Sequence, residues 1–255
     1  MKVVTYNLNG IRAAMNKGWL DWLKQNDFDI ICVQELKAEP GQLDTTLFDQ
    51  LGYYHNWHPA IKKGYSGVAI FSKIKPDHVE IGCGAEEYDC EGRVIRADFG
   101  DTSVFSIYFP SGTSGEIRQS VKYKFLNHIE AYLKNLQATR SKLIICGDYN
   151  IANKEIDIHN PVSNKNSTGF LPEERAWMDK FYASGYIDSF RHFNKDPHQY
   201  TWWSFRFNSR ASNKGWRIDY IAVTENLKQN LISAAILPDA LHSDHCPMVL
   251  EINLG

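Results

Sequence analysis

The sequence of 255 residues predicts an α/β protein in which two mixed β-sheets pack together with helices on the outside. Three observations predict this class. Apolar runs typical of buried strands alternate with segments of helical periodicity. Hairpin signals outnumber β-α-β units, which disfavours a (β/α)8 barrel built from regular repeats. No linker rich in Pro, Gly or Ser divides the chain, so we expect one domain spanning residues 1–255.

The elements follow from the hydrophobic pattern in chain order. Helices are expected over 18–26, where Trp19, Leu20 and Leu23 form an apolar face, and over 117–136 and 172–182. A further helix is expected over 40–51, with Pro40 at its start and Gly52 just past its end. Strands are expected at 3–7, 29–35, 53–58, 67–72, 79–82, 93–99, 102–110, 143–148, 216–223, 232–236 and 247–252.

Composition narrows the class of protein. The chain is 43 % hydrophobic and 23 % charged, typical of an ordinary soluble globular protein. Its apolar runs fall short of the roughly 18 residues that a membrane helix needs, and its start is too short for a signal peptide. The five cysteines have no Cys-x-x-Cys spacing, which disfavours a zinc ribbon or a disulfide framework. A reducing cytoplasm fits this usage best.

One stretch concentrates positive charge and aromatic side chains, although the net charge of the whole chain is −2. Residues 191–217 contain six basic residues and one acid, a local balance of 6 − 1 = +5, interleaved with tryptophan, tyrosine and phenylalanine. Such a surface can bind phosphates and stack on bases or sugars. The alternative is a solvated loop that its aromatic side chains pack onto the core.

Oxygen-bearing side chains end three of the expected strands. Asn7 ends the first, Glu35 the second, and Asp148 and Asn150 follow the apolar run at 143–146. Each case alone has an ordinary explanation, because polar residues commonly follow strands. The pairing of Asn7 with Asn150 and of Glu35 with Asp148 suggests two similar halves that bring these ends together, where a rigid sheet holds catalytic groups open to solvent.

The C-terminal region supplies a histidine and further carboxylates. Asp244 and His245 precede the last strand, and Asp219 opens an earlier one. A buried carboxylate can fix the tautomer of a histidine and favour the imidazolium, and we expect Asp219 to pair with His245. The alternative is a structural histidine. The mostly oxygen-bearing set suits Mg²⁺ or Mn²⁺ rather than zinc, and water as the nucleophile, which points to metal-assisted phosphodiester hydrolysis.

Seven short motifs in this order resemble the exonuclease III family of apurinic/apyrimidinic endonucleases. They are TYNLNG at 5–10, QELK at 34–37, YFPSG at 108–112, GDYN at 147–150, FLPEER at 170–175, WRIDY at 216–220 and SDH at 243–245. The match covers essentially the whole chain. It implies the four-layered α/β sandwich of two packed mixed β-sheets flanked by helices shared with pancreatic deoxyribonuclease I.

The resemblance also implies roles for individual residues. The metal ligands would be Asn7, Glu35, Asp148, Asn150 and Asp244, with Glu35 as the principal one. Asp148 would orient and deprotonate the attacking water, and Asn150 would hold both this water and the phosphate. His245, paired with Asp219, would stabilise charge on the phosphate. Tyr108 would hydrogen-bond the phosphate or, if ionised, assist attack.

The resemblance further implies a monomeric, Mg²⁺-dependent enzyme, with Mn²⁺ as a substitute. It would cut double-stranded DNA 5′ to abasic sites to leave a 3′-hydroxyl, act as a 3′-5′ exonuclease and clean blocked 3′ ends. Trp202, Trp216 and Ile218 would line a pocket too small for a nucleotide with its base, and Arg175, Arg206 and Lys214 would bind flanking phosphates. Of the neighbours Trp202 and Trp203, one is expected to be exposed and one buried.

Two residues depart from the pattern of the family. Asn9 stands where animal relatives carry Asp, which weakens the case for a second metal. Ser111 stands where near relatives carry Asn or Gln, which shortens or removes a phosphate contact. The alternatives are another phosphodiesterase of the superfamily, of inositol-phosphate or sphingomyelin type, and a non-catalytic DNA-binding module.

Overall fold

The chain builds two six-stranded sheets of the same design, the first from its N-terminal and C-terminal strands and the second from the strands between them. In the computed structural model, which describes residues 1–254, each sheet has one parallel strand pair at its centre with antiparallel neighbours outside. The first sheet is ordered β11 (Leu231–Ile236), β12 (Met248–Ile252), β1 (Lys2–Asn7), β2 (Ile30–Gln34), β4 (Val68–Ser72) and β3 (Tyr54–His58). The second is ordered β5 (His78–Ile81), β6 (Val94–Phe99), β7 (Thr102–Tyr108), β8 (Lys142–Asp148), β10 (Asp219–Thr224) and β9 (Tyr186–Asp188).

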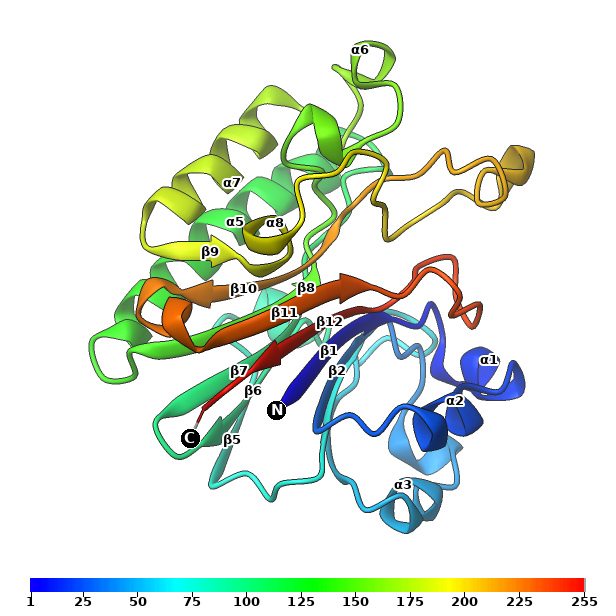
Figure 1. Ribbon diagram of the computed structural model, residues 1–255, viewed down its shortest axis with the longest axis vertical. Coiled ribbons are helices and arrows are strands. Elements are labelled where there is room, and N and C mark those ends of the chain that lie inside the picture. Colours follow the sequence, from blue (N-terminus) through cyan, green and yellow to red (C-terminus); the bar gives the residue numbers. More distant parts are fainter. Residues whose placement is uncertain (255) are drawn as a thin grey trace.

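The two sheets pack face to face and helices cover both outer faces (Figure 1). Apolar side chains of β1, β2 and β4 meet those of β6, β7, β8 and β10 in a continuous buried layer that includes Cys32 and Cys146. On the second sheet lie α5 (Glu116–Gln137) and α7 (Pro172–Ala183), and on the first lie α1 (Ile11–Asn16), α2 (Trp19–Gln25) and α3 (Thr46–Gln50). The expected four-layered sandwich is therefore confirmed.

Most of the expected elements are present, and the differences concern short ones. The sequence pattern missed α1, α4 (Glu86–Asp89), α6 (Pro161–Asn164), α8 (Ser189–Phe193) and β9. The strand expected from 216 begins at Asp219, because Trp216 instead forms isolated bridges with Trp202 and Ile158.

The helix expected over 40–51 is wrong as one element. A 3-10 turn at Pro40–Gln42 is followed by extended backbone at Leu43 (φ −136°, ψ 154°) before α3 begins. The Asp44 carboxylate accepts hydrogen bonds from the backbone N–H and the hydroxyl of Thr46. This local side-chain bonding competes with a continuous helix and starts a new one.

The parallel pairs determine where the polar strand ends lie. Parallel strands deliver their carboxyl ends to the same sheet edge, so β1 and β2 bring Asn7 and Glu35 together while β7 and β8 bring Tyr108 and Asp148 together. Because the sheets are stacked, the two edges face each other. Within the described residues, none of the helices is long and apolar enough to cross a membrane.

Candidate active site

A cavity of about 480 Å³ opens where the ends of the two central strand pairs meet. Most of the residues predicted for the site line it: Glu35, Tyr108, Asp148, Asn150, Trp202, Trp216, Ile218, Asp244 and His245. They come from positions spread over most of the chain and from both sheets. The spatial convergence expected from the sequence is therefore present.

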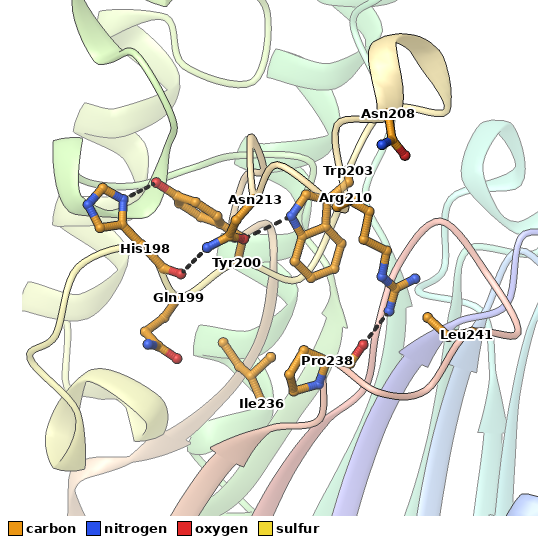
Figure 2. Close-up of a pocket in the computed structure, with 11 residues that line it drawn as sticks. His198, Gln199, Tyr200, Trp203, Asn208, Arg210, Asn213, Ile236, Pro238 and Leu241 are labelled. Atoms are coloured by element: carbon orange, nitrogen blue, oxygen red, sulfur yellow. Dashed lines mark hydrogen bonds between the residues drawn. The ribbon is translucent and has the colours of Figure 1, made fainter.

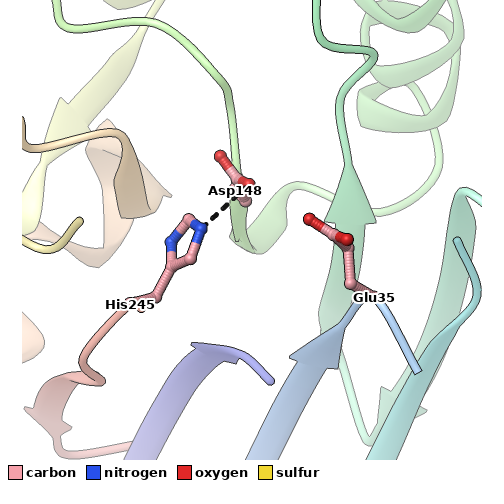
Figure 3. A group of neighbouring side chains, drawn as sticks. All are labelled: Glu35, Asp148 and His245. Atoms are coloured by element: carbon pink, nitrogen blue, oxygen red, sulfur yellow. Dashed lines mark ion pairs between the residues drawn. The ribbon is translucent and has the colours of Figure 1, made fainter. Parts of the chain in front are cut away.

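Three side chains at the floor of this cavity form a compact group of metal-ligand type (Figure 3). One ligand atom each from Glu35, Asp148 and His245 lies within 4.8 Å of the other two. The two carboxylates suit a hard divalent cation, which prefers oxygen ligands. Asp244 is outside this group, although it lines the same cavity: its carboxylate accepts hydrogen bonds from Asn9 Nδ2 (2.9 Å) and Trp202 Nε1 (3.1 Å).

Asn7 joins the carboxylates that come from the two sheets. Its Nδ2 donates to Glu35 Oε1 and to Asp148 Oδ2, each at 2.9 Å. Its Oδ1 accepts from the backbone N–H of Asn9 at 2.9 Å. The Asn7 amide thus holds the two acids at a fixed separation across the interface between the sheets, and its oxygen already has a partner.

Glu35 adopts an uncommon backbone conformation, with φ +51°. A non-glycine residue in this left-handed region costs on the order of 1–3 kcal/mol and is found where surrounding structure enforces it. Here Gly10 N–H donates to the Glu35 carbonyl oxygen (2.8 Å), and Lys37 Nζ donates to Glu35 Oε2 (2.7 Å). Burial by itself raises the pKa of Glu35, but the Lys37 charge and the Asn7 hydrogen bond outweigh it and lower the pKa. The carboxylate is therefore ionised at neutral pH.

Asp148 has the opposite electrostatic balance. Burial, and then the negative charge of Asp219, raise its pKa to about 7, although the positive charge of His245 opposes this. Its Oδ1 accepts from the backbone N–H of Asn150 (2.8 Å), whose own φ of +53° turns the chain back toward the carboxylate. A carboxylate with a pKa near neutrality is suited to accept and release a proton.

His245 is buried between two carboxylates. Its Nδ1 lies 2.8 Å from Asp219 Oδ2, and its Nε2 lies 3.9 Å from Asp148 Oδ2. Burial lowers its pKa, but the charge and hydrogen bond of Asp219 dominate and raise the pKa to about 10. The ring is an imidazolium at neutral pH, with Nε2 directed toward Asp148. The expected pairing of Asp219 with His245 is present in the structure.

Tyr108 borders the cavity on the side of the second sheet. Burial, and then the charges of Glu35 and Asp148, hold its pKa well above the ordinary value, so the phenol is neutral. The guanidinium of the buried Arg93 lies 5.0 Å from the centre of the Tyr108 ring and donates to its carbonyl oxygen (2.8 Å). A neutral phenol can donate a hydrogen bond to an anion.

The residues predicted to contact DNA divide into two groups. Trp202, Trp216 and Ile218 form an apolar wall with the buried Phe170, and the two indole rings meet edge to face with their centres 6.1 Å apart. Of the two neighbours, Trp203 is buried, as expected for one of them. Trp202 is only partly exposed, so the difference in exposure between them is smaller than expected.

The three predicted phosphate-binding cations do not line the cavity. Arg175 donates from Nε to the Asn153 carbonyl oxygen (3.0 Å) and lies over the Phe170 ring. Arg206 and Lys214 are exposed on the 204–214 loop.

Two residues behind the cavity were not among the predicted site residues, although one of them, Glu174, lies in the FLPEER motif. A buried ion pair behind the cavity joins Lys122 and Glu174, and Lys122 Nζ donates to the Asn150 carbonyl oxygen (2.8 Å). The Glu174 carboxylate also accepts from the backbone N–H groups of Gly169 (2.6 Å) and Leu171 (3.0 Å). A lysine in the middle of a helix, such as Lys122, is expected at the surface, and its partners Asn150 and Glu174 lie far away in the sequence.

Comparison with known proteins agrees with this geometry. The sequence pattern of the "Endonuclease/Exonuclease/phosphatase family" matches residues 4–245. An exodeoxyribonuclease of Bacillus subtilis (strain 168) is 43 % identical over 256 residues, covering 100 % of both chains. A solved AP endonuclease from Archaeoglobus fulgidus superimposes with a TM-score of 0.90 at 31 % identity, covering 100 % of both chains. A Neisseria 3′ phosphatase bound to a product DNA hairpin gives a TM-score of 0.92 at 26 % identity, covering 99 % of each chain.

Proposed function

The chain belongs to the endonuclease/exonuclease/phosphatase family, and from this premise we propose that it is a DNA-repair nuclease acting at abasic sites. It hydrolyses the phosphodiester 5′ to an abasic nucleotide in double-stranded DNA and leaves a 3′-hydroxyl. It also removes nucleotides and blocking groups from 3′ ends. The observation that carries the proposal is the meeting of Glu35, Asp148 and His245 beneath an apolar wall of two tryptophans.

The enzyme is metal-dependent, and we assign Mg²⁺, with Mn²⁺ as a substitute, to the group around Glu35. Glu35 would hold the ion, helped by Asp148, and Asn7, Asn150 and Asp244 would contribute oxygen ligands directly or through water. The bound cation would neutralise phosphate charge and lower the pKa of a bound water.

The side chains of the protein carry out the proton transfer and stabilise the charge on the phosphate. Asp148 takes a proton from the attacking water while Asn7 and Asn150 hold its carboxylate in place. His245 donates from Nε2 to a non-bridging phosphate oxygen, because Asp219 keeps the imidazolium charged and oriented. Tyr108 donates its phenolic hydrogen to the same phosphate. The water oxygen forms a bond to phosphorus as the bond between phosphorus and the 3′ oxygen breaks, and the proton taken from the water is balanced by one that the 3′ oxygen gains to leave as a hydroxyl.

The apolar wall accounts for the choice of substrate. An abasic sugar leaves the helix at little cost because it has no base to unstack, and Trp202, Trp216 and Ile218 would line the pocket that receives it. Arg175, Arg206 and Lys214 do not line the cavity, and we assign them to contacts with flanking phosphates outside it. We further assign the activity to a single domain of residues 1–255, acting as a monomer in the cytoplasm.

The test uses a duplex with one tetrahydrofuran abasic analogue, incubated with Mg²⁺ or with EDTA. The proposal predicts incision on the 5′ side of the analogue with Mg²⁺ and none with EDTA. Intact DNA together with hydrolysis of an inositol phosphate or sphingomyelin would assign the chain to another branch of the superfamily. Tight duplex binding without turnover would make it a DNA-binding module.

A further inference from the structure

Two irregular segments meet beside the cavity. The first, which we call the tip loop, comprises residues 204–214 and exposes Phe205 and Phe207 at 73 % and 93 %. The second, the acid–histidine segment, comprises residues 238–245 and carries Asp244 and His245 at its end. Neither has regular secondary structure beyond a single 3-10 turn at Arg206–Asn208, so the backbone of both segments depends on contacts other than a helix or a sheet.

Arg210 of the tip loop supplies contacts to the backbone of the acid–histidine segment, and Figure 2 shows the one to the carbonyl oxygen of Pro238. Its two terminal nitrogens carry four N–H groups, and each has a carbonyl acceptor in the acid–histidine segment. Nη2 donates to the oxygens of Pro238 and Ala240, each at 2.8 Å, and Nη1 donates to those of Ser243 at 2.9 Å and His245 at 3.5 Å. One guanidinium thus holds both ends of the segment.

The guanidinium is itself fixed by the residues around it. It stacks over the indole of Trp203, 4.7 Å from the ring centre. Trp203 is buried, its backbone N–H donates to the carbonyl oxygen of Asp244 (3.1 Å), and its Nε1 donates to Asn213 Oδ1 (3.1 Å). Arg210, Trp203 and Asn213 therefore connect the tip loop to the residue next to His245.

A lysine cannot replace this arrangement. The planar guanidinium directs its donors along fixed directions, whereas an ammonium is a compact point charge with three donors. Carbonyl groups left without partners in a partly buried segment cost about 1–3 kcal/mol each, which favours rearrangement of the segment. Rearrangement would displace Asp244 and His245 together.

We propose that Arg210 is a positioning residue that places Asp244 and His245 over the scissile phosphate. It acts through the backbone of the acid–histidine segment and not by touching the reacting atoms. This inference rests on the proposed function for the roles of Asp244 and His245. It also makes the tip loop, whose aromatic side chains face outward, part of the framework of the active site.

The experiment compares Arg210→Lys and Arg210→Ala with wild type. The control is Arg140→Lys, an arginine at the far end of the second sheet that likewise donates to a backbone carbonyl, that of Gly100. Incision of the abasic duplex gives kcat and KM, and duplex affinity is measured in EDTA. With ¹⁵N-histidine labelling, the Nδ1–H resonance of His245, hydrogen-bonded to Asp219, reports the order of the segment without any need for activity.

The proposal predicts that kcat falls by about 10- to 100-fold in both variants, as expected when reacting groups shift by about 1 Å. KM and duplex affinity should stay within threefold of wild type, the Nδ1–H signal of His245 should be lost or exchange-broadened, and the control should match wild type. Weaker duplex binding with unchanged kcat would instead make Arg210 a phosphate contact and overturn the proposal.

A lower melting temperature with unchanged kcat and an intact Nδ1–H signal would reduce Arg210 to a stabilising residue and also overturn it. Failure of the wild-type protein to incise the duplex would contradict the proposed function alone. The NMR comparison needs no activity, so it would still decide whether Arg210 orders His245.

Discussion

Replacing the buried carboxylate Asp148 with asparagine should lower turnover while stabilising the metal-free protein. Asparagine cannot accept the proton of the attacking water. Loss of general-base catalysis costs about 10²–10⁴ in rate, so we expect turnover to fall by at least about 100-fold. Binding of the duplex should persist because the apolar wall and the surface cations are unchanged.

The effect on stability follows from the raised pKa of Asp148. Burial, and then the Asp219 charge, raise that pKa from 3.8 to about 7, so the folded protein holds this proton more tightly than the unfolded chain does. Stability therefore decreases as pH rises from about 4 to about 7. Above that range, ionised Asp148 costs up to about 4 kcal/mol, since each pKa unit corresponds to about 1.4 kcal/mol.

Asparagine removes this cost but introduces a smaller one. Asp148 accepts from Asn7 Nδ2 and from the Asn150 backbone N–H, and the carboxamide nitrogen of the variant must face one of these donors. Loss of one buried hydrogen bond costs about 1–3 kcal/mol. The variant should therefore be more stable than wild type by about 1–3 kcal/mol at pH 8 and less stable at pH 4.

Urea unfolding in EDTA at both pH values measures this difference, with Asp21→Asn, an exposed carboxylate on α2, as the control. A variant that keeps more than a tenth of wild-type turnover would show that Asp148 is not the base. A variant less stable than wild type at pH 8 would show that charge repulsion does not dominate at this site.

Three further substitutions test other parts of the site. Glu35→Gln should raise the Mg²⁺ concentration for half-maximal activity by at least about 10-fold, since loss of even an indirect partner of a metal ligand costs that much; an unchanged activation curve would contradict the assignment. Asp219→Asn should lower kcat by about 10²–10³, the loss expected for one donor to a developing charge, because His245 loses the partner that keeps it charged; kcat within threefold of wild type at pH 7.5 would contradict this. Lys122→Met should lower the free energy of unfolding in urea by about 3–5 kcal/mol, because it leaves Glu174 charged and buried. Adding Glu174→Gln should recover much of this loss. A loss below about 1 kcal/mol in the single variant would show that Glu174 is not held as an ion.

Much of the fold was predictable because its core strands are continuous apolar runs. The runs before Asn7, Glu35 and Asp148 are buried on both faces, so hydrophobicity alone marks them. In each sheet, two such strands pair in parallel, which places their carboxyl ends at one edge of the sheet. This is why residues far apart in sequence were expected to meet. Short elements such as α8 and β9 lack enough residues for periodicity to identify them.

The details of the site depend on long-range contacts that the sequence does not display. Nothing local indicates that the amide nitrogen of Asn7 faces two carboxylates or that Asp244 pairs with Asn9. Arg210 looked like one more cation in a basic loop, yet its partners are backbone carbonyls about thirty residues away, which any sequence can offer. The basic residues at 191–217 predicted one phosphate-binding surface. In the fold, however, Arg210 binds backbone carbonyl groups, whereas Arg206 and Lys214 are exposed to solvent.

The most direct test of the account is a Mn²⁺ titration followed by NMR of the side-chain signals of Asn7, Asn150 and His245. Paramagnetic broadening falls steeply with distance, so the three signals report whether one ion lies near residues from both sheets. A single metal site between the sheets predicts that substoichiometric Mn²⁺ broadens all three signals together while the signals of β11 stay sharp. Broadening centred elsewhere, or confined to one sheet, would contradict a single metal site shared between the two sheets.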